Sequence, residues 1–216
     1  MTSLRKAFLL ASFLSFACFG AASASTLTIA ALGDSLTAGY GLPRAEGLVP
    51  QLEAWLRARG HDVSIRNAGV SGDTTRGGRA RVDWTLTPDV DAMIVTLGGN
   101  DVLRGLSPQK AKANLAAIIE AAQAKGVPVM LVGLTAPPNY GEAYKTAFNN
   151  MYRELADEYG TALHPNFFYN FFQGLERTAA LDRFMQRDRI HPNAEGVAVV
   201  IKSLGPAVED WINQIK

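Results

Sequence analysis

The chain has 216 residues, with 21 lysines and arginines against 20 aspartates and glutamates, so its formal net charge is +1. The positive and negative charges are thus nearly balanced, and the sequence has no cluster of basic residues. A nucleic-acid-binding protein usually has such a cluster, so we expect no nucleic-acid partner. The single cysteine, Cys18, excludes a disulfide framework and a site of several thiolate ligands.

The first 24 residues have the pattern of a secretory signal peptide. Arg5 and Lys6 form a short basic start, residues 7–22 are almost wholly apolar, and Ala22-Ser23-Ala24 offers small residues before a cleavage point. The apolar run is shorter than the roughly 20 residues that span a bilayer, so we expect no stable membrane anchor after cleavage. The sequence therefore predicts a periplasmic or secreted protein in which residues 25–216 form a single domain.

Apolar runs with strand preference alternate with segments of helical periodicity along residues 25–216. We expect strands at 27–32, 63–65, 92–97 and 127–132. Helices are expected at about 48–60, at 107–126, at 144–159 and from about 193, the last being interrupted at Gly205-Pro206. This alternation predicts an α/β fold, a doubly wound parallel sheet with helices on both faces, and we expect a monomer.

Three polar or small residues follow predicted strands at the same end. Ser35 comes after the strand at 27–32, Gly72 after the strand near 63–65, and Asn100 after the strand at 92–97. In open α/β sheets, ligands bind beyond the carboxyl ends of the strands. We therefore expect these three residues to belong to one site.

Nucleophilic acyl transfer requires a hydroxyl, a base, a group that orients the base, and donors for the oxyanion. Ser35 can supply the hydroxyl and His191 the base, while Asp188 lies three residues before His191 and can orient its ring. The oxyanion donors would be the backbone N–H groups of Ser35 and Gly72 and the side-chain amide of Asn100.

Three histidines occur, but only His191 has a carboxylate three residues before it. We expect His164 at a strand end or in a loop, and His61 in a surface turn. A metal hypothesis would group Asp182 and Asp188 with His191. Without a cysteine or a second nearby histidine this spacing is weak, so we expect no metal and no cofactor.

Four segments in this order, 33–36, 67–74, 97–105 and 188–193, resemble the blocks of the SGNH or GDSL hydrolase family. They are most similar to its small bacterial branch of thioesterase, lysophospholipase and arylesterase. The resemblance implies a flavodoxin-like three-layer fold, hydrolysis through an acyl-enzyme, and no metal. One departure is Arg189, because that branch often has glycine at this position.

The sequence thus predicts an exported serine esterase that hydrolyses small-molecule carboxylic esters and acyl-thioesters. Loops at 103–106, 136–140 and 167–172 would form an apolar groove for an acyl or aryl group. Two alternatives stay open: a carbohydrate acetylesterase, which a polar groove would favour, and a non-catalytic ligand-binding module on the same fold.

Overall fold

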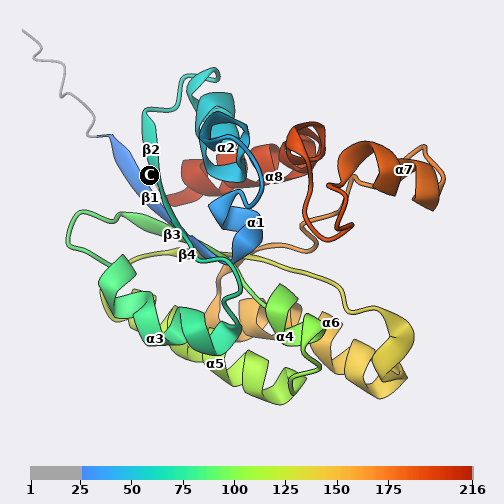
Figure 1. Cartoon of the computed structure of the whole chain (residues 1–216). Coiled ribbons are helices and arrows are strands. Elements are labelled where there is room, and N and C mark those ends of the chain that lie inside the picture. Colours follow the sequence, from blue (N-terminus) through green and yellow to red (C-terminus); the bar gives the residue numbers. More distant parts are fainter. Residues whose placement is uncertain (1–25, 216) are drawn as a thin grey trace, which may run out of the picture.

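The computed structural model describes residues 26–215, so the signal peptide predicted for residues 1–24 lies outside the described part. One parallel sheet runs through the centre of the molecule in the strand order β2-β1-β3-β4-β5 (Figure 1). The strands are β1 (Leu27–Gly33), β2 (Val63–Gly69), β3 (Ala92–Thr96), β4 (Val129–Val132) and β5 (Ala162–His164).

Helices cover both faces of this sheet. In Figure 1, α1, α2 and α8 lie on one side, and α3, α4, α5 and α6 on the other, while α7 stands beside α8. The predicted α/β fold with a parallel sheet between two helical layers is confirmed. The helices are α1 (Ser35–Ala38), α2 (Leu48–Arg57), α3 (Thr75–Thr85), α4 (Gly99–Leu103), α5 (Pro108–Gln123), α6 (Glu142–Tyr159), α7 (Arg177–Phe184) and α8 (Ala194–Ile215), with short 3-10 turns η1 (Arg44–Glu46) and η2 (Pro138–Tyr140).

Strands β3 and β4 of the sheet are buried along their whole length. Every residue of β3 is buried, as expected for a parallel strand that is covered on both faces. Helix α5 packs beside β4 and begins as predicted, with Ser107 accepting a hydrogen bond from the backbone N–H of Lys110 and Pro108 in the first turn. None of the helices between residues 26 and 215 is long and apolar enough to cross a bilayer.

The predicted interruption of the last helix is wrong, because α8 continues through Gly205 and Pro206 to Ile215. Packing outweighs the cost of the proline, since buried apolar residues line α8 both before and after it. Gly205 also permits a close approach to α2. A Cβ atom at this position would lie 2.9 Å from ring carbons of Trp55.

His61 is not the surface-turn residue that the sequence suggested. Only 12% of its side chain is exposed, and its Nε2 atom lies 2.9 Å from Oε1 of Glu209 on α8. The prediction for His164 is confirmed, because this residue ends β5.

Candidate active site

The candidate site lies at the carboxyl ends of β1 and β3. Ser35 is the first residue of α1, directly after β1, and Asp34 caps this short helix by accepting a hydrogen bond from the backbone N–H of Leu36 at 3.0 Å. Asn100 lies in α4, directly after β3. The strand ends thus hold Ser35 and Asn100 on neighbouring helix starts, as the order of the segments predicted.

A series of hydrogen bonds joins Ser35, His191 and Asp188. The Oγ atom of Ser35 lies 2.8 Å from Nε2 of His191, and Nδ1 of the same ring lies 2.7 Å from Oδ2 of Asp188. An ionised carboxylate can only accept, so Nδ1 carries the proton and donates it, which leaves Nε2 to accept from the serine hydroxyl. Residues 156 positions apart therefore meet with the donor and acceptor roles that proton transfer requires.

Asp188 has a second set of bonds. Its Oδ1 atom accepts hydrogen bonds from the backbone N–H groups of Ile190 and His191, at 2.9 and 3.0 Å. Partial burial raises the pKa of Asp188, but these bonds and the one from the His191 ring lower it more, so the pKa lies below its ordinary value. The carboxylate is therefore ionised at neutral pH.

The ring of Tyr40 packs against the ring of His191. The centroids of the two rings lie 4.6 Å apart, with a tilt of 40° between their planes. Gln186 holds this contact together, because its Nε2 atom donates to the carbonyl oxygens of Tyr40 at 2.7 Å and Pro192 at 3.0 Å. Neither residue could be predicted from the sequence, since neither their spacing nor their type distinguishes them from ordinary loop residues.

Asn100 is held by a buried carboxylate. Its Nδ2 atom donates to Oδ2 of Asp34 at 3.2 Å, and Asp34 is only 1% exposed. Burial raises the pKa of Asp34 to about 6, although hydrogen bonds from Leu36 and Asn100 act in the opposite direction. A primary amide has two N–H groups, so the second one of Asn100 is left for another acceptor.

Gly72 lies in the loop after β2, with a φ angle of +85° that glycine adopts without strain. Its carbonyl oxygen accepts a hydrogen bond from a guanidinium nitrogen of Arg104 at 2.8 Å. This bond ties the loop after β2 to the end of α4. The pocket beside Ser35 has Ser35 and Asn100 in its lining, whereas Gly72 lies outside that lining.

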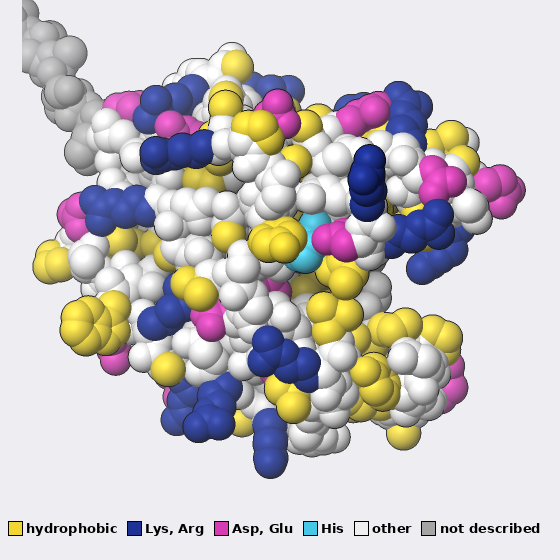
Figure 2. Space-filling model, in the orientation of Figure 1, with side chains coloured by type: hydrophobic (Ala, Val, Ile, Leu, Met, Phe, Trp, Pro, Cys, Tyr) yellow, Lys and Arg dark blue, Asp and Glu magenta, His cyan; other side chains and the backbone are white. Residues whose placement is uncertain are grey.

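An apolar pocket of about 200 Å3 opens beside Ser35. Each of the three predicted loops contributes to it, through Leu103, Pro137 and Phe168. Figure 2 shows a hollow on this face of the molecule, bordered by hydrophobic side chains, with a histidine at its mouth. Further lining residues are mostly apolar as well: Leu36, Val102, Leu134 and Ile190.

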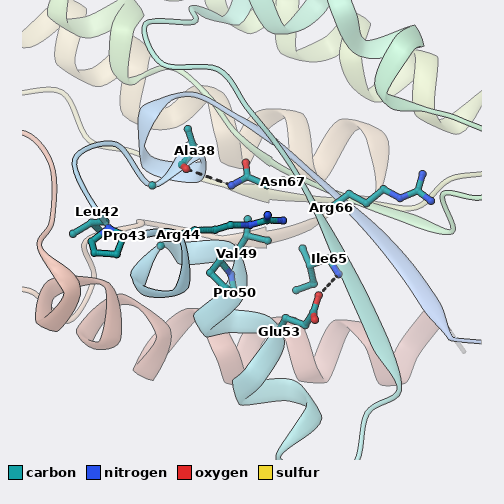
Figure 3. A pocket seen from close by; sticks show the side chains of 12 residues that line it. Ala38, Leu42, Pro43, Arg44, Val49, Pro50, Glu53, Ile65, Arg66 and Asn67 are labelled. Carbon is teal, nitrogen blue, oxygen red and sulfur yellow. Dashed lines mark hydrogen bonds between the residues drawn. The ribbon is translucent and has the colours of Figure 1, made fainter.

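A larger cavity, of about 650 Å3, lies between α2 and the edge strand β2 (Figure 3). Two of its polar side chains bind the backbone: Glu53 accepts from the N–H of Ile65 at 2.7 Å, and Asn67 donates to the carbonyl of Ala38 at 3.4 Å. Ser35 and His191 are not part of its lining. Ser35 lines the smaller pocket instead.

The metal hypothesis grouped Asp182, Asp188 and His191. These side chains do not gather around a common point. Asp182 accepts a hydrogen bond from Arg189 at 2.6 Å, while Asp188 is bonded to His191. Within residues 26–215, no group of three or more His, Cys, Asp and Glu side chains has the arrangement of a metal site.

A hydroxyl, an imidazole and a carboxylate are hydrogen-bonded in series at the carboxyl edge of a parallel sheet. These are the groups of a serine hydrolase. The chain belongs to the GDSL-like lipase/acylhydrolase family, which it matches over residues 31–199. This finding confirms the resemblance noted in the sequence and makes the chain a carboxylic ester hydrolase.

Known relatives agree with this assignment. Esterase TesA of Pseudomonas aeruginosa is 37% identical over 187 residues, covering 86% of this chain and 90% of the relative. Thioesterase 1/protease 1/lysophospholipase L1 of Escherichia coli K12 is 34% identical over 201 residues, covering 93% of this chain and 87% of the relative. The crystal structure of esterase EstA from Pseudoalteromonas sp., inhibited by monoethylphosphonate, superposes with a TM-score of 0.78 at 30% identity and covers 86% of this chain and 98% of EstA.

Proposed function

We propose that this protein is an exported serine esterase that cleaves carboxylic esters and acyl-thioesters through an acyl-enzyme. The observation that carries the proposal is the series of hydrogen bonds from Ser35 through His191 to Asp188, at 2.8 and 2.7 Å. These contacts give the serine hydroxyl a base within reach and give that base a fixed orientation.

The reaction has two halves. In the first, Nε2 of His191 takes the proton of Ser35 while Oγ attacks the carbonyl carbon, and the imidazolium then gives this proton to the leaving alcohol or thiol. In the second half, His191 takes a proton from water as the water oxygen attacks the carbonyl carbon of the acyl-serine ester. The imidazolium then returns this proton to Oγ of Ser35 as the acyl–oxygen bond breaks and the acid leaves. Asp188 stabilises the imidazolium in both halves.

The negative oxygen of each tetrahedral intermediate needs donors. The backbone N–H groups of Ser35 and Gly72 and the free N–H of the Asn100 amide would supply them. Asp34 supports the third donor, because its buried carboxylate accepts the other N–H of Asn100 and so fixes the rotation of the amide.

The apolar pocket beside Ser35 favours acyl or aryl groups over a sugar. Each buried methylene contributes only about 0.8 kcal/mol, so selectivity for chain length is modest and we expect broad specificity. A relative inhibited by a phosphonate supports a tetrahedral intermediate on serine, since a phosphonate resembles one in shape and charge.

Export rests on the sequence of residues 1–24, with its basic start, apolar run and small residues before a cleavage point. A periplasmic or secreted location follows from it. Because Ser35, His191, Asp188 and Asn100 all come from one chain, the site needs no second copy, and we propose a monomer.

Replacement of the proposed nucleophile and base tests this mechanism. We expect Ser35→Ala and His191→Ala each to lower the kcat for a p-nitrophenyl ester by about three orders of magnitude or more. Far-UV circular dichroism should show that both variants remain folded. Ser71→Ala is the matched control, since Ser71 also stands in a Gly- and Asp-containing turn, and its kcat should equal that of the wild type. A Ser35→Ala variant with near wild-type turnover would contradict the assignment.

A further inference from the structure

Arg189 has an unusual backbone conformation for an arginine. Its φ angle is +57°, and among residues 26–215 it is the only residue other than glycine with a positive φ. A side chain in this left-handed region brings its Cβ atom close to the backbone, which disfavours the conformation for every residue except glycine. Arg189 stands between Asp188 and His191, so the strained residue lies inside the segment that positions both of them.

The turn around Arg189 is closed by backbone bonds. The N–H of Arg189 donates to the carbonyl of Gln186 at 2.9 Å, and the N–H of Gln186 donates to the carbonyl of His191 at 2.8 Å. These bonds define the path of the chain, but they do not remove the unfavourable contact of the Arg189 side chain with its own backbone.

The side chain of Arg189 is anchored outside the turn. One guanidinium nitrogen lies 2.6 Å from Oδ1 of Asp182, which belongs to α7. Because α7 packs against α8, this ion pair connects the turn to a helix that is itself supported by the body of the protein. The pair therefore opposes any relaxation of Arg189 toward an ordinary φ angle.

We propose that the Arg189–Asp182 ion pair is a positioning contact that keeps the turn of Asp188 and His191 in its left-handed conformation, so that His191 reaches Ser35. The inference rests on the function proposed above for these residues. In this chain an arginine and a partner carboxylate do what a glycine could do through its conformational freedom alone.

This role differs from substrate binding. The side chains of Arg189 and Asp182 are 59% and 58% exposed, and neither residue lines the pocket beside Ser35. Loss of the pair should therefore change the rate of the chemical step rather than the binding of substrate. An exposed ion pair contributes little to global stability by itself, so the effect belongs to local geometry.

A comparison of alanine with glycine at position 189 tests the proposal. Both Arg189→Ala and Arg189→Gly lose the ion pair, but only glycine takes the left-handed conformation without strain. We expect Arg189→Ala and Asp182→Ala to lower kcat for a p-nitrophenyl ester by about three- to tenfold, with KM within about twofold of the wild type. Arg189→Gly should recover most of the rate lost in Arg189→Ala, and adding Asp182→Ala to Arg189→Gly should cause no further loss.

The matched control is Glu195→Ala. Glu195 on α8 is 51% exposed and pairs with Arg183, which lies on α7 as Asp182 does. This pair does not include a residue of the turn, so the kcat of Glu195→Ala should equal that of the wild type. Equal kcat values for Arg189→Ala and Arg189→Gly, or wild-type kcat for Asp182→Ala, would overturn the proposal. The Ser35→Ala variant separates the two ideas: if it is inactive while Asp182→Ala is unaffected, the positioning role fails and the proposed function stands.

Discussion

The two carboxylate oxygens of Asp34 accept hydrogen bonds from different parts of the site. One oxygen caps α1 at Leu36, and the other accepts from the amide of Asn100, so a single buried residue links the helix of the proposed nucleophile to a proposed oxyanion donor. Two other aspartates near the strand ends have simpler contacts. Asp101 accepts a hydrogen bond from the backbone N–H of Thr75 at 2.8 Å, and Asp73 accepts one from the side chain of Arg81.

Burial of Asp34 has a consequence for stability that can be measured. Its folded pKa of about 6 lies above the ordinary value of 3.8, so the native state binds a proton more tightly than the unfolded chain. This group therefore lowers the free energy of unfolding as the pH rises from about 4 to about 7, by on the order of 2 kcal/mol. The variant Asp34→Asn lacks this titration.

Urea unfolding of the wild type and Asp34→Asn across this pH range checks the prediction. The difference in free energy of unfolding between the two proteins cancels the other titrating groups, and it should move in favour of the variant as the pH rises. A difference that stays constant with pH would show that Asp34 titrates in the folded protein as it does in the unfolded chain.

At the scale of elements, strongly periodic segments were predictable and glycine-rich or short ones were not. Helix α5 has a capping serine, a proline in its first turn and a clear apolar stripe, so its start and buried face follow from the sequence. Helix α3 contains Gly77 and Gly78, which weaken helical propensity. Its packing depends on the close approach of Leu97 to Gly78, a tertiary contact that no local pattern encodes.

The contact between β2 and α1 is a second example of such close packing. A Cβ atom at Gly69 would lie 2.3 Å from the backbone nitrogen of Ala38 in α1, so only glycine fits without a backbone shift. We expect Gly69→Ala to lower the free energy of unfolding by about 1–3 kcal/mol and to lower kcat, because α1 also carries Ser35.

Unfolding and kinetics of Gly69→Ala should be compared with those of Gly47→Ala. An added methyl group at Gly47 meets no atom closer than 3.5 Å, which is ordinary van der Waals contact, so both properties should stay near wild type. If Gly69→Ala were as stable and as active as Gly47→Ala, the β2–α1 contact would not determine the position of Ser35.

At the scale of the whole molecule, the parallel sheet brings the separated segments together. Ser35 and Asn100 could be predicted as neighbours because adjacent parallel strands end at the same edge. His191 could be chosen over His164 because only it has an aspartate three residues before it. The supporting contacts of Tyr40, Gln186 and Arg189 depend on how distant loops fold onto one another, and no spacing in the sequence reveals them.

The central claim is that Ser35 is a nucleophile activated by His191. Labelling of the folded protein with a fluorophosphonate, followed by intact mass measurement and peptide mapping, tests it most directly. The account predicts one adduct per chain, located on Ser35 in the wild type and strongly reduced in His191→Ala. An unlabelled Ser35 in folded protein that still hydrolyses esters would contradict it.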